Sequence, residues 1–405
     1  MYLKHLSLTN FRLFIRLDME MPRRILLLIG DNAQGKTSFL ESIYYLSTFT
    51  SFHTQVGRQL INFKAVEEDL AVSRIVADFQ RGSQTHRIEV RLIKEPNGTG
   101  KDRFRKEILV DSVHKTAQEG LGYFNAVLFL PQMTRILEGG PEERRRYLNL
   151  VVCQAFPDYA AALAEYSQGL VRRNALLKQL AERGGDRKQL LFWDDLLAKR
   201  GSQIIYRRIH ALNELENHAR RIHQRLTNAQ EVLRMDYQPS FDPIPHPNGQ
   251  IALPLEVNVD RERITQEQIY LGFMERLQSL QREEIARGQT CIGPHRDEIR
   301  FLSNRIDLGE YGSRGQIRTA LMSLKLAEAA WLEEKTGQTP VILLDEMMSE
   351  LDLQRRKDLL NYLEDVEQAL ITTTDLRMFP ENFEQRCTVW RINQGVVQPL
   401  QTAQG

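Results

Sequence analysis

The sequence predicts an α/β fold with a mixed sheet, an antiparallel β subdomain and an inserted pair of long antiparallel helices. Two apolar runs, at residues 25–29 and 341–344, have the composition of strands buried on both faces of a largely parallel sheet. Between them, apolar residues recur at steps of three and four over residues 142–226, the spacing of helices with one buried face. We therefore expect one split domain that carries a helical insertion.

The composition is that of an ordinary globular protein. Of the 405 residues, 42% are apolar and 26% are charged, and the length predicts two or three compact units. The net charge of +1 means that any surface for nucleic acid must be a local patch. The three cysteines form no C-x-x-C pair, so neither a disulfide framework nor a zinc site is indicated. Because we find no signal-peptide core and no apolar run of about 18 residues, we expect a cytoplasmic protein without a membrane partner.

Short strands are predicted on both sides of the first buried run. Residues 2–8 and 14–21 precede it, and a predicted helix at 38–46 follows it. Three further strands are separated by turn residues and form the expected antiparallel subdomain, at 71–79, 88–93 and 108–113. One more apolar strand is expected at 126–129.

A glycine-rich loop joins the first buried strand to its helix. It matches the phosphate-binding pattern G-x-x-x-x-G-K-T over Gly30, Asp31, Asn32, Ala33, Gln34, Gly35, Lys36 and Thr37. The glycines allow a tight turn whose backbone N–H groups point at phosphate oxygens. Lys36 can reach the β- and γ-phosphates, Thr37 can bind Mg2+, and the helix N-terminus at Ser38 favours an anion. A chance glycine-rich turn is the alternative, but the strand before and the helix after both favour the phosphate loop.

The sequence pattern changes from short strand-like runs to helical periodicity at the Gly-Gly-Pro run that ends at Pro141. Two helical stretches follow, at 142–183 and 189–226, and a short turn between them predicts an antiparallel arm up to roughly 60 Å long. After a proline-rich connection at 240–254 and a helix at 266–287, the chain returns to the first domain. We therefore expect residues 1–140 and 288–405 to form the head and residues 141–287 to form the inserted arm.

The arm is more basic than the rest of the chain. Residues 141–227 hold sixteen Lys or Arg against ten Asp or Glu. Several of the cations stand in adjacent pairs, at Arg172-Arg173, Lys199-Arg200, Arg207-Arg208 and Arg220-Arg221. This pattern fits a solvated helical face, and it fits equally a stripe that contacts phosphates of a nucleic acid.

The second buried strand ends in two acids. Asp345 at the strand end can hold Mg2+ beside Thr37, and Glu346 is placed to orient or deprotonate an attacking water. The alternative to a catalytic role is that this is an ordinary core strand followed by two surface acids. The phosphate loop at the other end of the chain makes the catalytic interpretation the stronger one, with Glu346 and Lys36 as the catalytic pair.

A serine-led helix start precedes the acidic strand. Ser313, Gly315 and Gln316 form S-x-G-Q before a predicted helix at 317–335, where backbone N–H groups, a hydroxyl and the helix dipole can meet a phosphate. This run resembles the signature of ABC-type ATPases, which completes the site of a second subunit. Three other positions fit the same type of protein: Gln132 as a Q-loop glutamine or an ordinary surface residue, Asp352 in a dimer loop, and Thr374 where a switch histidine is usual.

The order of these pieces resembles an ABC-type ATPase head of the SMC/Rad50 kind, and more narrowly the RecF family of recombination-mediator ATPases. Further runs carry the resemblance, at 8–12, 139–145 with Leu148, 173–177, 293–298 and 344–352. The Gly-Pro-His-Arg-Asp run that begins at Gly293 is the most specific. Asn149 and His53 depart from the family, which usually has Asp and Arg at these positions.

The resemblance implies an ATP-dependent homodimer in which two heads enclose two ATP molecules with Mg2+. Such a dimer would hold double-stranded DNA beside a single-stranded gap and act with RecR and RecO to load RecA, while slow hydrolysis separates the subunits. The arm is too short for an SMC or Rad50 coiled coil. Three alternatives remain: another short SMC-like ATPase, a structural DNA clamp with little turnover, and a P-loop phosphotransferase such as a kinase. Ser313 and Gln316 argue against the kinase, and Glu346 argues for turnover.

Overall fold

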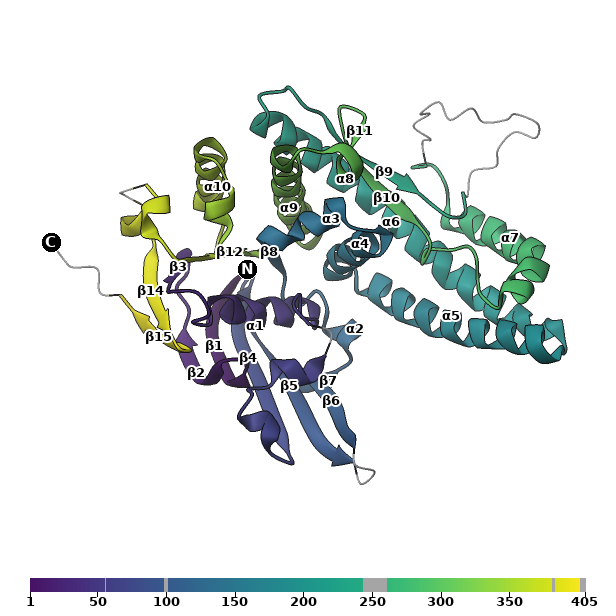
Figure 1. Cartoon of the computed structure of the whole chain (residues 1–405), viewed down its shortest axis with the longest axis horizontal. Helices are drawn as coiled ribbons and strands as arrows, with labels where there is room; N and C mark the ends of the chain where they lie inside the picture. The colour runs from purple at the N-terminus through teal and green to yellow at the C-terminus, as the bar shows by residue number, and fades with distance from the viewer. Residues whose placement is uncertain (55, 98–100, 243–260, 381–382, 401–405) are drawn as a thin grey trace. The chain divides into compact units, whose positions relative to one another are not determined.

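The computed structural model describes residues 1–54, 56–97, 101–242, 261–380 and 383–400 (Figure 1). It divides into two compact units: Met1–Thr134 with Leu321–Gly405, and Arg135–Ala320. The segment expected to form the arm, 141–287, lies in the second unit, which also takes in 135–140 and 288–320. Most of the proline-rich connection predicted at 240–254 lies outside the described residues. None of the described helices combines the length and the apolarity needed to cross a bilayer.

The first unit contains a six-stranded mixed sheet in the order β15-β14-β3-β13-β12-β8. β15 (Val396–Pro399) is its one antiparallel edge, and five strands are parallel: β14 (Thr388–Asn393), β3 (Ile25–Ile29), β13 (Ala369–Thr373), β12 (Val341–Asp345) and β8 (Ala126–Phe129). Every residue of β12 is buried, as its apolar run predicted, and every residue of β13 is buried as well. Because the strands are parallel, the loops after β3, β12 and β13 leave from the same edge of the sheet, which is where open α/β sheets bind ligands.

The antiparallel subdomain is a second six-stranded sheet in the order β2-β1-β4-β5-β6-β7. Its strands are β1 (Tyr2–Phe11), β2 (Phe14–Glu20), β4 (Ala71–Arg81), β5 (Gln84–Asn97), β6 (Lys101–Val110) and β7 (Val113–Lys115). The single strand predicted at 108–113 was wrong, because Asp111 and Ser112 take φ of 50° and 67° and turn the chain between β6 and β7. Between the sheets lies α1 (Lys36–Thr48), whose Phe39, Leu40 and Ile43 share one hydrophobic core with strands of both.

Helices dominate the second unit: α3 (Arg135–Glu138), α4 (Pro141–Ala155), α5 (Pro157–Arg183), α6 (Leu190–Leu226), α7 (Gln266–Arg287), α8 (Leu308–Tyr311) and the start of α9 (Arg314–Thr336). The helix predicted at 142–183 is two helices, because Phe156 is extended and Pro157 starts a new first turn. By contrast, α6 runs unbroken through Gly201 for 37 residues, about 55 Å. A Cβ at Gly201 would lie 2.5 Å from Phe273 of α7, so this glycine serves close helix packing.

α5 and α6 run in opposite directions along each other, and α7 packs on both (Figure 1). The antiparallel arrangement of the two arm helices is therefore confirmed. The sequence did not predict the three-stranded sheet of this unit, in the order β11-β10-β9, which is formed by β9 (Leu233–Gln238), β10 (Glu298–Ser303) and β11 (Ile306–Asp307). These strands are short, and β9 and β10 are far apart in the chain, so local periodicity carries little signal for their pairing. Nor did the sequence predict α10 (Leu353–Asp365), which follows β12 in the first unit, or α2 (Ala117–Gly120).

Candidate nucleotide-binding site

The glycine-rich loop leaves β3 and enters α1 in the shape that its pattern predicts. Gly35 precedes the first helical residue with φ of 111°, a conformation that side chains rarely adopt. Gly30 lies against β14, since a Cβ there would come within 2.5 Å of the carbonyl oxygen of Ile392. Both glycines are thus required, one by backbone conformation and one by close packing.

Gln34 ties the loop to the turn between β14 and β15. Its Oε1 accepts a hydrogen bond from the backbone N–H of Gln394 at 2.7 Å, and its carbonyl oxygen accepts one from the N–H of Gly395 at 3.0 Å. These two bonds hold the middle of the loop from the protein side. The turn therefore supports the loop from a part of the chain that the sequence motif does not include.

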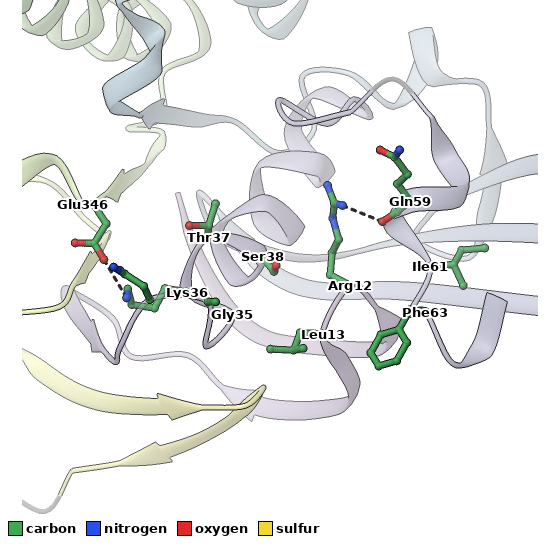
Figure 2. Close-up of a pocket in the computed structure, with 12 residues that line it drawn as sticks. Arg12, Leu13, Gly35, Lys36, Thr37, Ser38, Gln59, Ile61, Phe63 and Glu346 are labelled. Atoms are coloured by element: carbon green, nitrogen blue, oxygen red, sulfur yellow. Dashed lines mark hydrogen bonds and ion pairs between the residues drawn. The ribbon is translucent and has the colours of Figure 1, made fainter. Parts of the chain in front are cut away.

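Lys36 lies under the loop, and its side chain is only 5% exposed. Its Nζ donates to the carbonyl oxygens of Gly30 at 2.6 Å and Asp31 at 2.9 Å, and it lies 3.0 Å from Oε1 of Glu346 (Figure 2). The structure therefore brings the two predicted catalytic side chains into contact, although they are far apart in the sequence.

The pair predicted to hold a metal also meets. The Thr37 hydroxyl donates to Oδ2 of Asp345 at 2.7 Å, and the Thr372 hydroxyl donates to Oδ1 at 2.7 Å. Asp345 is buried and oriented through both oxygens. A hydroxyl and a carboxylate oxygen are suitable ligands for Mg2+, which completes its shell with water and phosphate oxygens. Accordingly, no group of three His, Cys, Asp or Glu among the described residues is arranged to bind a metal alone.

Glu346 takes a left-handed conformation directly after β12, with φ of 53° and ψ of 21°. A non-glycine residue there costs about 1–3 kcal/mol and persists only where its surroundings hold it. Its backbone N–H donates to the Thr372 hydroxyl at 3.1 Å, which fixes this turn from β13. Thr372 was absent from the predicted site, yet it positions both acids.

These groups open on a cavity of about 420 Å³. Its lining combines loop residues with the start of the chain and a later irregular segment: Arg12, Leu13, Asn32, Ala33, Gly35, Lys36, Thr37, Ser38, Gln59, Ile61, Phe63 and Glu346 (Figure 2). Seven of these were predicted. The other five form the wall opposite Glu346, and only Arg12 belongs to a motif that the sequence had marked.

The additional wall has one charged and one apolar part. Arg12 donates twice to Glu41, with both distances 2.8 Å, and once to the carbonyl oxygen of Gln59 at 2.9 Å, so its guanidinium is held in place. Phe63 is 62% exposed beside the buried Ile61. An exposed aromatic ring at the mouth of a phosphate site offers a surface for a flat apolar group.

Seven predicted residues of this unit do not line the cavity: Gly30, Asp31, Gln34, Gln132, Asp345, Asp352 and Thr374. The first three belong to the loop and Asp345 bonds Thr37, whereas the other three lie elsewhere. Gln132 and Thr374 are exposed, on the turns that follow β8 and β13. Asp352 caps α10, and the hydrogen bond from the N–H of Arg355 lowers the pKa of its carboxyl group. Within a single chain, the side chains of Gln132, Thr374 and Asp352 are therefore exposed at the surface.

The serine-led run starts α9 in the second unit. Ser313 is exposed, its Oγ accepts from the N–H of Gln316 at 3.3 Å, and its own N–H donates to Oε1 of Gln316 at 3.0 Å. These reciprocal bonds form a capping box. A Cβ at Gly315 would make only an ordinary contact with the Ser313 Oγ, at 4.0 Å, and Gly315 is exposed, so the helix start is accessible in this chain. Gln316 also donates to Glu231 at 3.3 Å, which fixes its side chain.

Two of the arginines in the basic pairs are buried. Arg173 has no exposed side-chain surface and bonds Asp194 at 2.7 Å, Glu284 at 2.7 Å and Thr290 at 2.8 Å, which joins α5 to α6 and α7. Arg208 is 2% exposed and bonds Asp297 at 2.9 Å and the carbonyl oxygen of Pro294 at 2.6 Å. The Gly-Pro-His-Arg-Asp run therefore holds the second unit together through Asp297.

Asn149 takes part in the same network. Its Oδ1 accepts from the Tyr159 hydroxyl at 2.6 Å and from Arg208 at 3.1 Å. Asp297 already neutralises the charge of Arg208. The neutral amide of Asn149 can therefore accept the hydrogen bonds of Tyr159 and Arg208 without adding a second buried negative charge. His295 of the run hydrogen-bonds Tyr166 at 2.8 Å, and burial lowers its pKa to about 4.

The basic pairs therefore do not form a continuous stripe of exposed cations. Arg200 and Arg207 form ion pairs with Glu165 and Asp158, and Arg172 lies over the ring of Trp193. Lys199 and Arg221 are exposed. The other departure, His53, is also exposed, and its ring centroid lies 4.4 Å from that of Phe52 at a tilt of 50°.

Residues 2–398 match the family described as the RecF/RecN/SMC N-terminal domain. The chain is 36% identical to the DNA replication and repair protein RecF of Roseiflexus castenholzii, over 98% of this chain and all of the relative. It is 34% identical to RecF of Chloroflexus aurantiacus, over 98% of this chain and 99% of the relative. A solved structure of the recombination mediator protein RecF with ATP, from the RecFOR pathway, superposes with a TM-score of 0.82 at 31% identity, covering 98% of this chain and 97% of that one.

Proposed function

This chain belongs to the RecF family of DNA replication and repair proteins, and we propose that it is an ATP-gated dimer that binds double-stranded DNA at single-strand gaps. Its fold is the α/β ABC-type ATPase head that the sequence predicted. The observation that carries the proposal is the contact of Lys36 with Glu346 and of Thr37 with the buried Asp345, where Lys36, Thr37 and Glu346 line one cavity.

The arrangement supports ATP with Mg2+ as the ligand. The loop N–H groups and Lys36 would bind the phosphates, and the Thr37 and Asp345 oxygens, which are 2.7 Å apart, would hold the metal. Mg2+ would neutralise charge on the β- and γ-phosphates. The apolar wall of Leu13, Ile61 and Phe63 would pack against the base.

We assign slow ATP hydrolysis to Glu346. Its carboxylate lies beside Lys36 and its backbone is held by Thr372, so it is oriented to align a water and accept its proton. Glu346→Gln should abolish phosphate release and leave an ATP-bound dimer. Unchanged turnover in this variant would remove Glu346 from the mechanism.

The second half of each site would come from a partner copy. Ser313 and Gly315 are exposed at the N-terminus of the 23-residue helix α9, where a γ-phosphate would meet the helix dipole and free N–H groups. Gln316 would act indirectly, since its side chain is used to cap the helix. The exposed Gln132, Asp352 and Thr374 fit contacts that form in the dimer.

The proposed partners follow from the family. We propose that the dimer acts with RecR and RecO to promote loading of RecA in the cytoplasm, and that DNA stimulates its slow hydrolysis. Exposed arm cations such as Lys199 and Arg221 are the DNA contacts we favour over Arg173 and Arg208, because the buried pair is already neutralised by carboxylates. In this proposal, residues 1–140 and 288–405 act as the ATPase head, and residues 141–287 act as the arm.

Gel filtration with ATP, ADP and no nucleotide tests this function. We expect a dimer with ATP alone, and phosphate release that rises when gapped duplex DNA is added. A monomer in all three conditions would support a phosphotransferase, whereas an ATP-dependent dimer without measurable turnover would support a structural clamp.

A further inference from the structure

The first unit has a second hollow, apart from the nucleotide cavity, between α10 and the segment that precedes β14. Its volume is about 450 Å³. Its lining comes from α10 and from residues 377–380, 383 and 386: Leu353, Arg356, Lys357, Leu360, Asn361, Glu364, Arg377, Met378, Phe379, Pro380, Phe383 and Arg386. We call it the α10 groove. None of its residues lines the nucleotide cavity.

The floor of the α10 groove is apolar. Phe379 and Phe383 stack on each other with ring centroids 5.2 Å apart, and they are only 7% and 4% exposed. Leu360 is buried beside them, whereas Leu353 at the mouth is 81% exposed. A solvent-exposed leucine next to an apolar hollow is typical of a surface that buries an apolar side chain of a binding partner.

The rim of the groove is cationic. Four Arg or Lys line it against one acid, Glu364, which pairs with Arg386 at 2.7 Å. Arg377 pairs with Asp375, yet its side chain remains 91% exposed, and Lys357 is exposed. The described lining therefore has a positive balance beside an apolar floor.

Arg356 leaves one donor unused. Its Nη2 donates to the carbonyl oxygen of Leu351 at 2.9 Å, while its Nε is buried and has no hydrogen-bond acceptor among the described residues. A buried donor without an acceptor destabilises the folded protein. A carboxylate oxygen that enters the groove would bring an acceptor to the guanidinium group of Arg356, which lines it.

We propose that the α10 groove binds a short peptide segment of another protein that combines acidic side chains with one large apolar side chain. The apolar side chain would enter the hollow beside Leu353, and the acids would meet Arg356, Lys357 and Arg377. Single-stranded nucleic acid fits less well, because base stacking needs an open aromatic face and the two phenylalanines are stacked on each other and buried.

Fluorescence anisotropy with the labelled peptide EDELDF tests this inference on the full chain. We expect saturable binding that weakens with salt and disappears when the acids of the peptide become lysines or its Leu and Phe become serines. Lys357→Glu with Arg377→Glu should weaken binding at least about tenfold. Arg16→Glu with Lys64→Glu, which changes one exposed Arg and one exposed Lys of the same unit outside the groove, should leave it unchanged.

Leu353→Ser supplies an independent variant, since this side chain is too exposed to support the fold. It should weaken peptide binding several-fold without changing thermal stability. The proposal is overturned by absence of binding, by equal binding of the Lys357→Glu, Arg377→Glu protein, or by displacement of the peptide by oligo-dT. It is also overturned if Leu353→Ser weakens ATP-dependent dimerisation alone, because the occupant would then be a second copy of the chain.

Discussion

The nucleotide cavity and the buried arginine network of the second unit are both built from charged motif residues, and they use charge in opposite ways. At the cavity, Lys36 and Glu346 face an open space that can take a ligand. In the network, Arg173 and Arg208 are enclosed, and their charge is matched by Asp194, Glu284 and Asp297. A specific motif can therefore mark a binding site or an internal clamp, and exposure to a cavity distinguishes the two.

Removing Arg173 should give the largest loss of stability. Arg173→Met leaves Asp194 and Glu284 buried without their cation, so we expect the free energy of unfolding to fall by about 3–5 kcal/mol. Urea unfolding followed by helical circular dichroism measures this loss. Arg200→Met is the matched control, because its pair with Glu165 is partly exposed and contributes about 0–1 kcal/mol. Equal losses in the two variants would contradict the clamp.

Protonation of His295 should give the next largest effect. Burial holds its pKa at about 4, against about 6.5 in the unfolded chain, so the folded protein keeps the ring neutral while the unfolded chain takes up a proton. The free energy of unfolding should therefore fall as the pH drops from about 6.5 to 4, by on the order of 3 kcal/mol. His295→Gln should flatten this slope and the exposed His53→Gln should not; identical slopes in both would refute the assignment.

Loosening Gln34 should have the smallest effect, and on ligand affinity rather than stability. Gln34→Met keeps the length of the side chain but removes the acceptor for the N–H of Gln394, so we expect ATP binding to weaken about fivefold, or about 1 kcal/mol. Titration calorimetry measures the affinity. Gln394→Ala retains the backbone donor and should bind ATP as the natural protein does. If both variants bind equally well, the turn does not shape the loop.

The comparison also separates what the sequence could predict from what it could not. The loop from Gly30 to Thr37 is contiguous, and Asp345 ends an apolar strand, so local pattern located both. Gln59 lies in a single 3-10 turn, Gly57–Leu60, and Phe63 follows it, so no local pattern marks either residue as part of the cavity.

The basic pairs show most clearly what could not be predicted from the sequence. Adjacent residues of a helix point about 100° apart, so two neighbouring arginines cannot both lie at the centre of an outer face. Arg172 is exposed while Arg173 is buried, and Arg207 remains partly exposed while Arg208 is enclosed. Periodicity could have suggested that one member faces inward, but the carboxylates that receive it come from distant helices and loops.

In the proposed dimer, each ATP would be bound by the loop of one chain and by the Ser313 helix start of another. Lys36→Ala should weaken ATP binding, and Ser313→Arg should keep ATP binding while losing ATP-dependent dimerisation; the exposed Ser279→Arg is the control for an added arginine. Each variant alone should remain monomeric with ATP. Light scattering on a mixture of the two variants is the most direct test, because a heterodimer would combine one intact loop with one intact helix start. We predict that the mixture forms ATP-dependent dimers, and a mixture that stays monomeric, or a Ser313→Arg protein that dimerises alone, would contradict the account.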